Sequence, residues 1–208
     1  MAIVDDLSTG SRAAGVRNVV YISTGGAGYG DTDVVPTPET HLTRPQSPYG
    51  VSKVAAELYL DCWAGLHAGR GVSLRLANVY GPRQNPEGEA GVVAIFTRRL
   101  LSGRSCVING DGEQTRDYVY VGDVADAVTR AVTRAGATGA INVGTSRETT
   151  VNEIYKTPAE YGPARPVEQR RSALGWDRAG RLLEWSPQTT LAHGLAETVT
   201  WARAHDGR

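Results

Sequence analysis

Tyr49 and Lys53, one helical turn apart, are the residues of this sequence best suited to chemistry. Side chains at i and i+4 lie on the same face of a helix, so the pair would share one surface. A phenol is a poor base at neutral pH, but a fixed ammonium and the positive end of a helix both favour the phenolate. The pair is therefore a candidate general base for a sugar or alcohol hydroxyl. On its own the spacing is weak, because it is common in helices without a catalytic role.

Two hydroxyl side chains strengthen this interpretation. Ser23 and Thr24 end a predicted buried strand that precedes Tyr49 in the chain. In α/β proteins, ligands bind at the carboxyl ends of parallel strands. A hydroxyl at this position could bridge a substrate and Tyr49. The segment SPYGVSK at residues 47–53, which contains both Tyr49 and Lys53, is more specific than the Tyr-Lys spacing alone.

The surrounding elements follow an α/β pattern, with short β-branched runs alternating with longer amphipathic ones. Ser47 is a good N-cap and Pro48 suits the first helical position, so a helix is predicted to begin there. Its apolar residues keep helical spacing, and we expect Cys62 among them to be buried. The predicted strands are 2–4, 18–23, 72–76, 106–108 and 140–143, and the other predicted helices are 92–101, 123–135 and 190–205.

Composition excludes several classes of protein. The chain has 208 residues, with 22 Lys and Arg against 22 Asp and Glu, which argues against a nucleic acid or an anionic membrane as the main partner. Its two cysteines, Cys62 and Cys106, cannot form a disulfide framework and lie near no metal-ligating cluster. No apolar run is long enough for a membrane helix, and no signal segment is recognisable, so we expect a cytoplasmic protein.

Several further motifs occur in a characteristic order. They are VDDLSTG at residues 4–10, VYISTGGA at 20–27, SPYGVSK at 47–53, LRLANVYGPRQ at 74–84, GDG to QTRDYV at 110–119, and the segment 165–171. With these motifs the sequence resembles the NAD-dependent epimerase/dehydratase family of extended short-chain dehydrogenase/reductases, and its UDP-glucose 4-epimerase-like members most closely.

The resemblance implies an α/β fold, here an incomplete Rossmann-like doubly wound parallel sheet with a small C-terminal α/β substrate-binding subdomain. Residues 1–81 would form the partial NAD-binding core with the catalytic helix. Residues 82–208 would supply the nucleotide-sugar-binding subdomain and return in part to the core. The family homodimer would pack the SPYGVSK helix beside the helix preceding NVVYIS, of which only residues 12–16 remain.

The resemblance also implies roles for individual residues. Tyr49 would be the acid/base, and Lys53 would lower its pKa and hold the nicotinamide ribose of NAD. Thr24 or Ser23 would be the hydroxyl partner, although counting back from Tyr29 places Gly25 where some relatives carry the serine. Asp5, Asp6 and Ser8 would bind the adenosine ribose, and the UDP part of the substrate would be held by Asn78, Arg116, Arg165 and Glu168.

The implied activity is epimerisation of a UDP-sugar through a 4-keto intermediate, with NAD as the bound cofactor. Two segments of the family are not found in this sequence. One is a glycine-rich loop about 20 residues before the ribose-binding acid. The other is the long segment that in relatives separates LSTG from AAGVRNVVYIS, in whose place only Ser11 and Arg12 stand here. A nucleotide-sugar-binding or vestigial member, or an incomplete gene model, is therefore the alternative. Within the family, a decarboxylase or a reductase stays open. A dehydratase is less favoured, because Gly25 and Gly26 stand where acids would be needed.

Overall fold

A three-stranded parallel sheet forms the centre of the computed structural model, which describes residues 10, 14–87, 91–155, 159–164 and 169–205. Its strands are β1 (Asn18–Thr24), β2 (Arg70–Leu76) and β7 (Gly139–Val143), in the order β1-β2-β7. Among the described residues β1 pairs with β2 alone and is an edge strand. The strand predicted at 2–4 lies outside the described residues.

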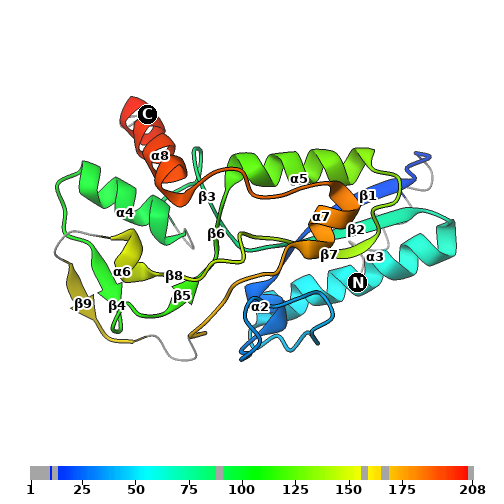
Figure 1. Ribbon diagram of the computed structural model, residues 1–208, viewed down its shortest axis with the longest axis horizontal. Coiled ribbons are helices and arrows are strands. Elements are labelled where there is room, and N and C mark those ends of the chain that lie inside the picture. Colours follow the sequence, from blue (N-terminus) through cyan, green and yellow to red (C-terminus); the bar gives the residue numbers. More distant parts are fainter. Residues whose placement is uncertain (1–9, 11–13, 88–90, 156–158, 165–168, 206–208) are drawn as a thin grey trace.

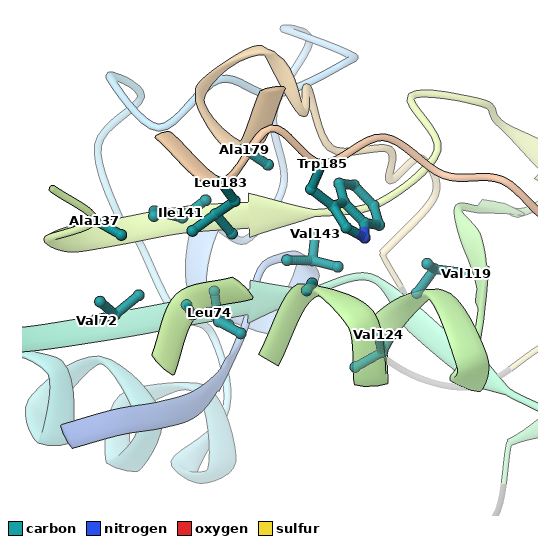
Figure 2. Packing of buried hydrophobic residues seen from close by; sticks show 12 residues of the cluster. Val72, Leu74, Val119, Val124, Ala137, Ile141, Val143, Ala179, Leu183 and Trp185 are labelled. Atoms are coloured by element: carbon teal, nitrogen blue, oxygen red, sulfur yellow. The ribbon is translucent and has the colours of Figure 1, made fainter. Parts of the chain in front are cut away.

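Helices cover both faces of this sheet, as the alternation of side chains along β2 requires. Val72 and Leu74 point to one face and join a buried cluster with α5 (Val121–Thr133) and α7 (Asp177–Leu183). Figure 2 shows Trp185 and Leu183 packed against this cluster. The other face of the sheet packs against α3 (Pro48–His67), so the sheet lies between α5 and α3 (Figure 1). The predicted α/β, Rossmann-like architecture is confirmed.

The helix α3 begins as predicted. Ser47 has an extended backbone, and its Oγ accepts a hydrogen bond from the Gly50 amide at 3.1 Å, while Pro48 occupies the first turn. The prediction of a buried Cys62 was wrong, because Cys62 is exposed and so is Leu58, at 66%. The face of α3 that meets the sheet carries Leu60 and Trp63, so the apolar stripe on its other side is left open.

The remaining elements form a second region beside the sheet (Figure 1). Phe96, Cys106 and Ile108 are the centre of its core. Its strand pairs are β3 (Asn78–Tyr80) with β6 (Tyr118–Tyr120), β4 (Val107–Asn109) with β9 (Glu160–Gly162), and β5 (Thr115–Arg116) with β8 (Thr149–Thr150). Its helices are α4 (Val92–Leu101), α6 (Val151–Ile154) and α8 (Leu191–His205).

The chain passes between the two regions more than once. β2 leads through Ala77 directly into β3, and β7, from the 82–208 segment, returns to pair with β2. The division at residue 81 stays a prediction. The glycine-rich segment after β1 forms the short helix α2 (Gly26–Tyr29). None of the helices in the described part of the chain is both long and apolar enough to span a bilayer.

Candidate active site

A cleft of about 540 Å³ opens at the carboxyl ends of β1 and β2, where the sheet meets the second region. Parallel α/β sheets bind ligands at this end of their strands. Six of the predicted site residues line the cleft together, namely Ser23, Thr24, Tyr49, Lys53, Asn78 and Arg116. Residues far apart in the sequence therefore converge on one site.

Tyr49 occupies the first turn of α3, close to the positive end of the helix. Its side chain is 53% exposed and lines the cleft. The capping of Ser47 and the fixed φ of Pro48 define where this turn begins, and hence where Tyr49 is presented. An accessible phenol in this position can reach a bound ligand.

Lys53 follows one turn later on the same face. Its ammonium donates a hydrogen bond to the Ile22 carbonyl at 2.9 Å, which ties α3 to the last part of β1. The same nitrogen lies 5.8 Å from the ring centroid of Tyr49 and 5.1 Å from that of Tyr21. Burial raises the pKa of Tyr21, and Tyr49 and Glu57 raise it further, so Tyr21 stays a neutral phenol at this site. The predicted proximity of Tyr49 and Lys53 is confirmed.

The three candidate positions for the hydroxyl partner differ in what surrounds them. Ser23 is buried and its Oγ donates to the Glu57 carboxylate, so that hydroxyl is already committed to the interior. Gly25 cannot carry a side chain without rearrangement, because a β-carbon there would lie 2.4 Å from Cδ1 of the buried Leu174. Thr24, half-buried and lining the cleft, is the position whose side chain suits a ligand.

Asn78 and Arg116 bring polar groups from the second region. Asn78 is exposed at the start of β3, and its backbone amide donates to the Asp117 carbonyl at 2.8 Å. The Arg116 guanidinium donates from Nη1 to the carbonyls of Thr115 and Gln169, both at 2.7 Å. These contacts hold a guanidinium at the cleft wall, where its planar fork suits phosphate oxygens.

The N-terminus of α4 adds a further anion-binding feature. Gly91 lines the cleft and precedes the helix, and no described side chain caps this end. An uncapped helix N-terminus presents backbone N–H groups and a partial positive charge to a ligand. No Asp or Glu is among the described residues lining the cleft, which leaves Lys53 and Arg116 as its charged groups. The cleft is therefore suited to an anionic ligand.

Three glutamines in the cleft wall were not predicted from the sequence. They are Gln46, Gln84 and Gln169. Gln84 donates to the Val79 carbonyl at 3.1 Å and Gln169 to the Gly30 carbonyl at 2.7 Å, so each also ties loops together. Amide side chains have no characteristic spacing. The available signals were the positions of Gln84 at the end of the LRLANVYGPRQ motif and of Gln169 within the segment 165–171.

Five predicted site residues lie outside the described part of the chain. They are Asp5, Asp6 and Ser8, assigned to the adenosine ribose, and Arg165 and Glu168, assigned to the UDP part. Their assignments stay predictions.

Comparison with known proteins identifies the family of the chain. The family model "NAD dependent epimerase/dehydratase family" matches residues 1–144. The chain is 46% identical over 206 residues to a UDP-glucose 4-epimerase from Mycolicibacterium smegmatis, an alignment that includes 95% of this chain and 66% of the relative.

Two solved structures are also similar. The UDP-glucose 4-epimerase of Thermotoga maritima, solved with UDP-glucose, has a TM-score of 0.93 at 43% identity, covering 97% of this chain and 68% of that one. The Thermus thermophilus UDP-glucose 4-epimerase, solved with NAD, has a TM-score of 0.88 at 39% identity, covering 96% and 68%.

The length of these relatives differs from that of this chain, which spans 66% of the Mycolicibacterium smegmatis protein. The family match nevertheless covers most of the chain, and the structural similarity extends over both regions of the fold. The chain belongs to the NAD dependent epimerase/dehydratase family.

Proposed function

We propose that this chain acts in the epimerisation of a UDP-sugar at C4, through a transient 4-keto sugar, as a UDP-glucose 4-epimerase does. The observation that carries the proposal is the convergence of Tyr49, Lys53 and Thr24 with Asn78 and Arg116 on one cleft. The first three residues suit proton transfer with a sugar hydroxyl. The other two suit a nucleotide diphosphate. The relatives named UDP-glucose 4-epimerase support the same activity.

In this mechanism Tyr49 removes the proton of the sugar 4-hydroxyl and returns it after the sugar has turned. Thr24 would bridge the same hydroxyl and the Tyr49 oxygen, and Lys53 would favour the phenolate through its charge. Asn78, Arg116 and the N-terminus of α4 would hold the diphosphate throughout, so that the sugar alone changes its orientation.

The residues at this end of the cleft fit the nicotinamide half of NAD. The Lys53 ammonium has three donors and makes one hydrogen bond among the described residues, to Ile22, so further donors can reach ribose hydroxyls. Tyr49 presents its phenol beside it. NAD, when bound, supplies the hydride acceptor for oxidation at C4. The proposed contacts to its adenosine half, Asp5, Asp6 and Ser8, come from outside the described residues.

The cleft favours epimerisation over dehydration within the family. A dehydratase needs an acid to protonate the leaving hydroxyl, and the described cleft residues include no Asp or Glu. Positions 25 and 26, directly after Thr24, are glycines. A reductase or a decarboxylase would show itself in the assay below as a product other than the C4 epimer.

A second candidate function is binding of a nucleotide sugar without turnover. One observation favours it: among the described residues β1 pairs with β2 alone, so the further strands of a doubly wound sheet are not seen beside it. Such a chain would keep the UDP contacts and lack a complete NAD site.

We further infer that a second copy covers the outer face of α3. Its exposed apolar residues Val51, Leu58 and Leu66 are 52%, 66% and 74% accessible, and they follow helical spacing along one face. A stripe of this kind typically marks an interface.

A cytoplasmic location completes the proposal. It is supported by Cys62 and Cys106, which are both free thiols.

The test is turnover and cofactor content of the purified chain. UDP-galactose is supplied with NAD, the appearance of UDP-glucose is followed by proton NMR, and bound NAD is measured by mass spectrometry of the purified protein. Formation of UDP-glucose, lost in Tyr49→Phe, supports epimerisation. UDP binding without NAD and without turnover would overturn it in favour of the second candidate.

A further inference from the structure

Directly beneath the cleft, five polar side chains meet in the interior between α3 and the sheet. Ser23, Tyr29, Glu57, Arg75 and Asn142 are each at least nine-tenths buried. A buried charge is costly unless it is paired and hydrogen-bonded. None of these five side chains takes part in the proton transfer proposed above, so another role must explain why they lie here.

Glu57 and Arg75 form the centre of the cluster. The Arg75 Nη2 to Glu57 Oε2 distance is 2.6 Å, and the Arg75 Nε lies 3.1 and 3.0 Å from the two carboxylate oxygens. Burial lowers the pKa of Arg75, but the hydrogen bonds and charge interactions with Glu57 and Tyr29 together outweigh it and raise the pKa, so Arg75 stays charged. The Ser23 hydroxyl donates to the Glu57 Oε1. One carboxylate thus joins α3, β1 and β2.

The cluster continues to the third strand. Arg75 Nη1 donates to the Tyr29 hydroxyl at 2.9 Å, and that hydroxyl donates to the Asn142 Oδ1 at 2.8 Å. Asn142 in turn donates from Nδ2 to the Thr37 and Gly175 carbonyls. The strands β1, β2 and β7 and the catalytic helix are therefore connected through directional contacts at one level of the fold.

The positions of these residues relative to the site are specific. Tyr49, Lys53 and Glu57 follow each other at intervals of four along one face of α3, and Ser23 directly precedes Thr24. Glu57 is about 12 Å along the helix axis from Tyr49, at 1.5 Å per residue. Apolar contacts alone allow a helix to slide on a sheet, whereas a hydrogen-bonded ion pair accepts one arrangement. Replacing a buried ion pair by apolar residues often leaves stability unchanged, so we look to the geometry of this pair for its role.

We propose that Glu57 is a positioning residue: by holding Arg75 and the Ser23 hydroxyl, it fixes α3 against β1 and so sets the separation of the Tyr49 and Thr24 hydroxyls. The proposal rests on the proposed function of this cleft. It gives Ser23 a role different from the one expected from the sequence, since its hydroxyl faces Glu57 and acts on Thr24 through the backbone.

The test compares Glu57→Gln with a control variant of similar burial. Asp123→Asn is the control, because the Asp123 carboxylate is buried and accepts hydrogen bonds from the Gln188 and Thr189 amides, away from the cleft. Since a misplacement of about 1 Å can slow a reaction about 100-fold, we expect Glu57→Gln to lower kcat about 30-fold or more. Its KM for UDP-galactose should stay within about threefold, since the proposed diphosphate contacts lie on other elements.

Both variants should unfold at lower temperature, but Asp123→Asn should keep the wild-type kcat per folded molecule. Ser23→Ala leaves the ion pair in place and removes the link to β1 alone, so we expect kcat to fall about fivefold with KM unchanged. If Glu57→Gln does not fold, Ser23→Ala decides the question. Equal kcat values in wild type and in the variants of Glu57 and Ser23 would overturn the proposal.

A second readout does not depend on turnover. Hydrogen exchange followed by mass spectrometry should show lost protection in peptides from α3 and β1 in Glu57→Gln, and in peptides from α5 in Asp123→Asn. If the wild type binds UDP but turns nothing over, the proposed function fails and this exchange pattern still tests the positioning role. Unchanged protection of α3 and β1 in Glu57→Gln would refute it.

Discussion

Replacing Thr24 by valine exchanges a hydroxyl for a methyl group of nearly the same shape at the mouth of the cleft. No neighbouring position can supply a hydroxyl in place of Thr24. The neighbouring Ser23 hydroxyl is engaged with Glu57, and a β-carbon at Gly25 would collide with Leu174. If Thr24 bridges the sugar hydroxyl and Tyr49, no other side chain of this strand end can take over its hydrogen bond.

The size of the effect follows from the hydrogen bond that is lost. A hydrogen bond to a charged partner contributes about 1.5–3 kcal/mol, and the Tyr49 oxygen is charged when it acts as the base. At about 1.4 kcal/mol for each factor of ten, kcat should fall about 10- to 150-fold. Thr24 is half-buried at a strand end, so the free energy of unfolding should change by less than about 1 kcal/mol.

The assay is conversion of UDP-galactose to UDP-glucose at saturating NAD, with thermal unfolding measured alongside. Thr24→Ser keeps a hydroxyl and is the matched control, expected within about fivefold of wild type. The reasoning would be refuted if Thr24→Val retained wild-type kcat. A larger loss in Ser23→Ala than in Thr24→Val would assign the bridging hydroxyl to Ser23 instead.

Three further predictions concern other parts of the molecule. The Arg171 hydrogen bond, together with that of Thr115, holds the pKa of Glu148 below its usual 4.5, so its stabilisation is present above that pH and is lost as the pH falls through the lowered value. Because Arg171 is half exposed, Glu148→Gln should lower the free energy of unfolding at pH 7 by at most about 1 kcal/mol, and that free energy should fall less steeply with acid than in the wild type. Urea unfolding from pH 7 to 3 measures both effects. An unchanged dependence of the free energy of unfolding on pH would contradict this prediction. Arg116→Met should weaken UDP binding about 10- to 100-fold in calorimetry, and undiminished affinity would remove Arg116 from the diphosphate site. Leu58→Lys should reduce the molar mass seen by light scattering from that of a dimer to that of a monomer, and a wild-type chain that is already monomeric would contradict the proposed α3 interface.

The parts of the site that depend on local rules were predictable from the sequence. The Ser47 cap and Pro48 fix the start of α3, and intervals of four along a helix put Tyr49 and Lys53 on one face. The hydroxyls at the end of the NVVYIS strand lie at the cleft because parallel strands present their carboxyl ends to ligands. The helix at 92–101 has the predicted bounds for the same local reason, a clear helical periodicity.

Features that depend on contacts between distant segments were not predictable. The apolar spacing of α3 suggested a buried Cys62, but the burial of Glu57 on the opposite side is possible only because Arg75 and Ser23 meet it there. Short strands such as β5 and β8 have two residues each, too few for any periodicity. The glutamines of the cleft wall likewise follow from how loops are brought together.

The central claim is that Tyr49 takes a proton from a sugar hydroxyl in this cleft, and Tyr49→Phe tests it most directly. Tyr49 is 53% exposed, so losing its hydroxyl should leave folding and UDP affinity unchanged. Conversion of UDP-galactose to UDP-glucose should fall at least about 100-fold, the usual contribution of a general base. A Tyr49→Phe protein that converts UDP-galactose at the wild-type rate would contradict the account.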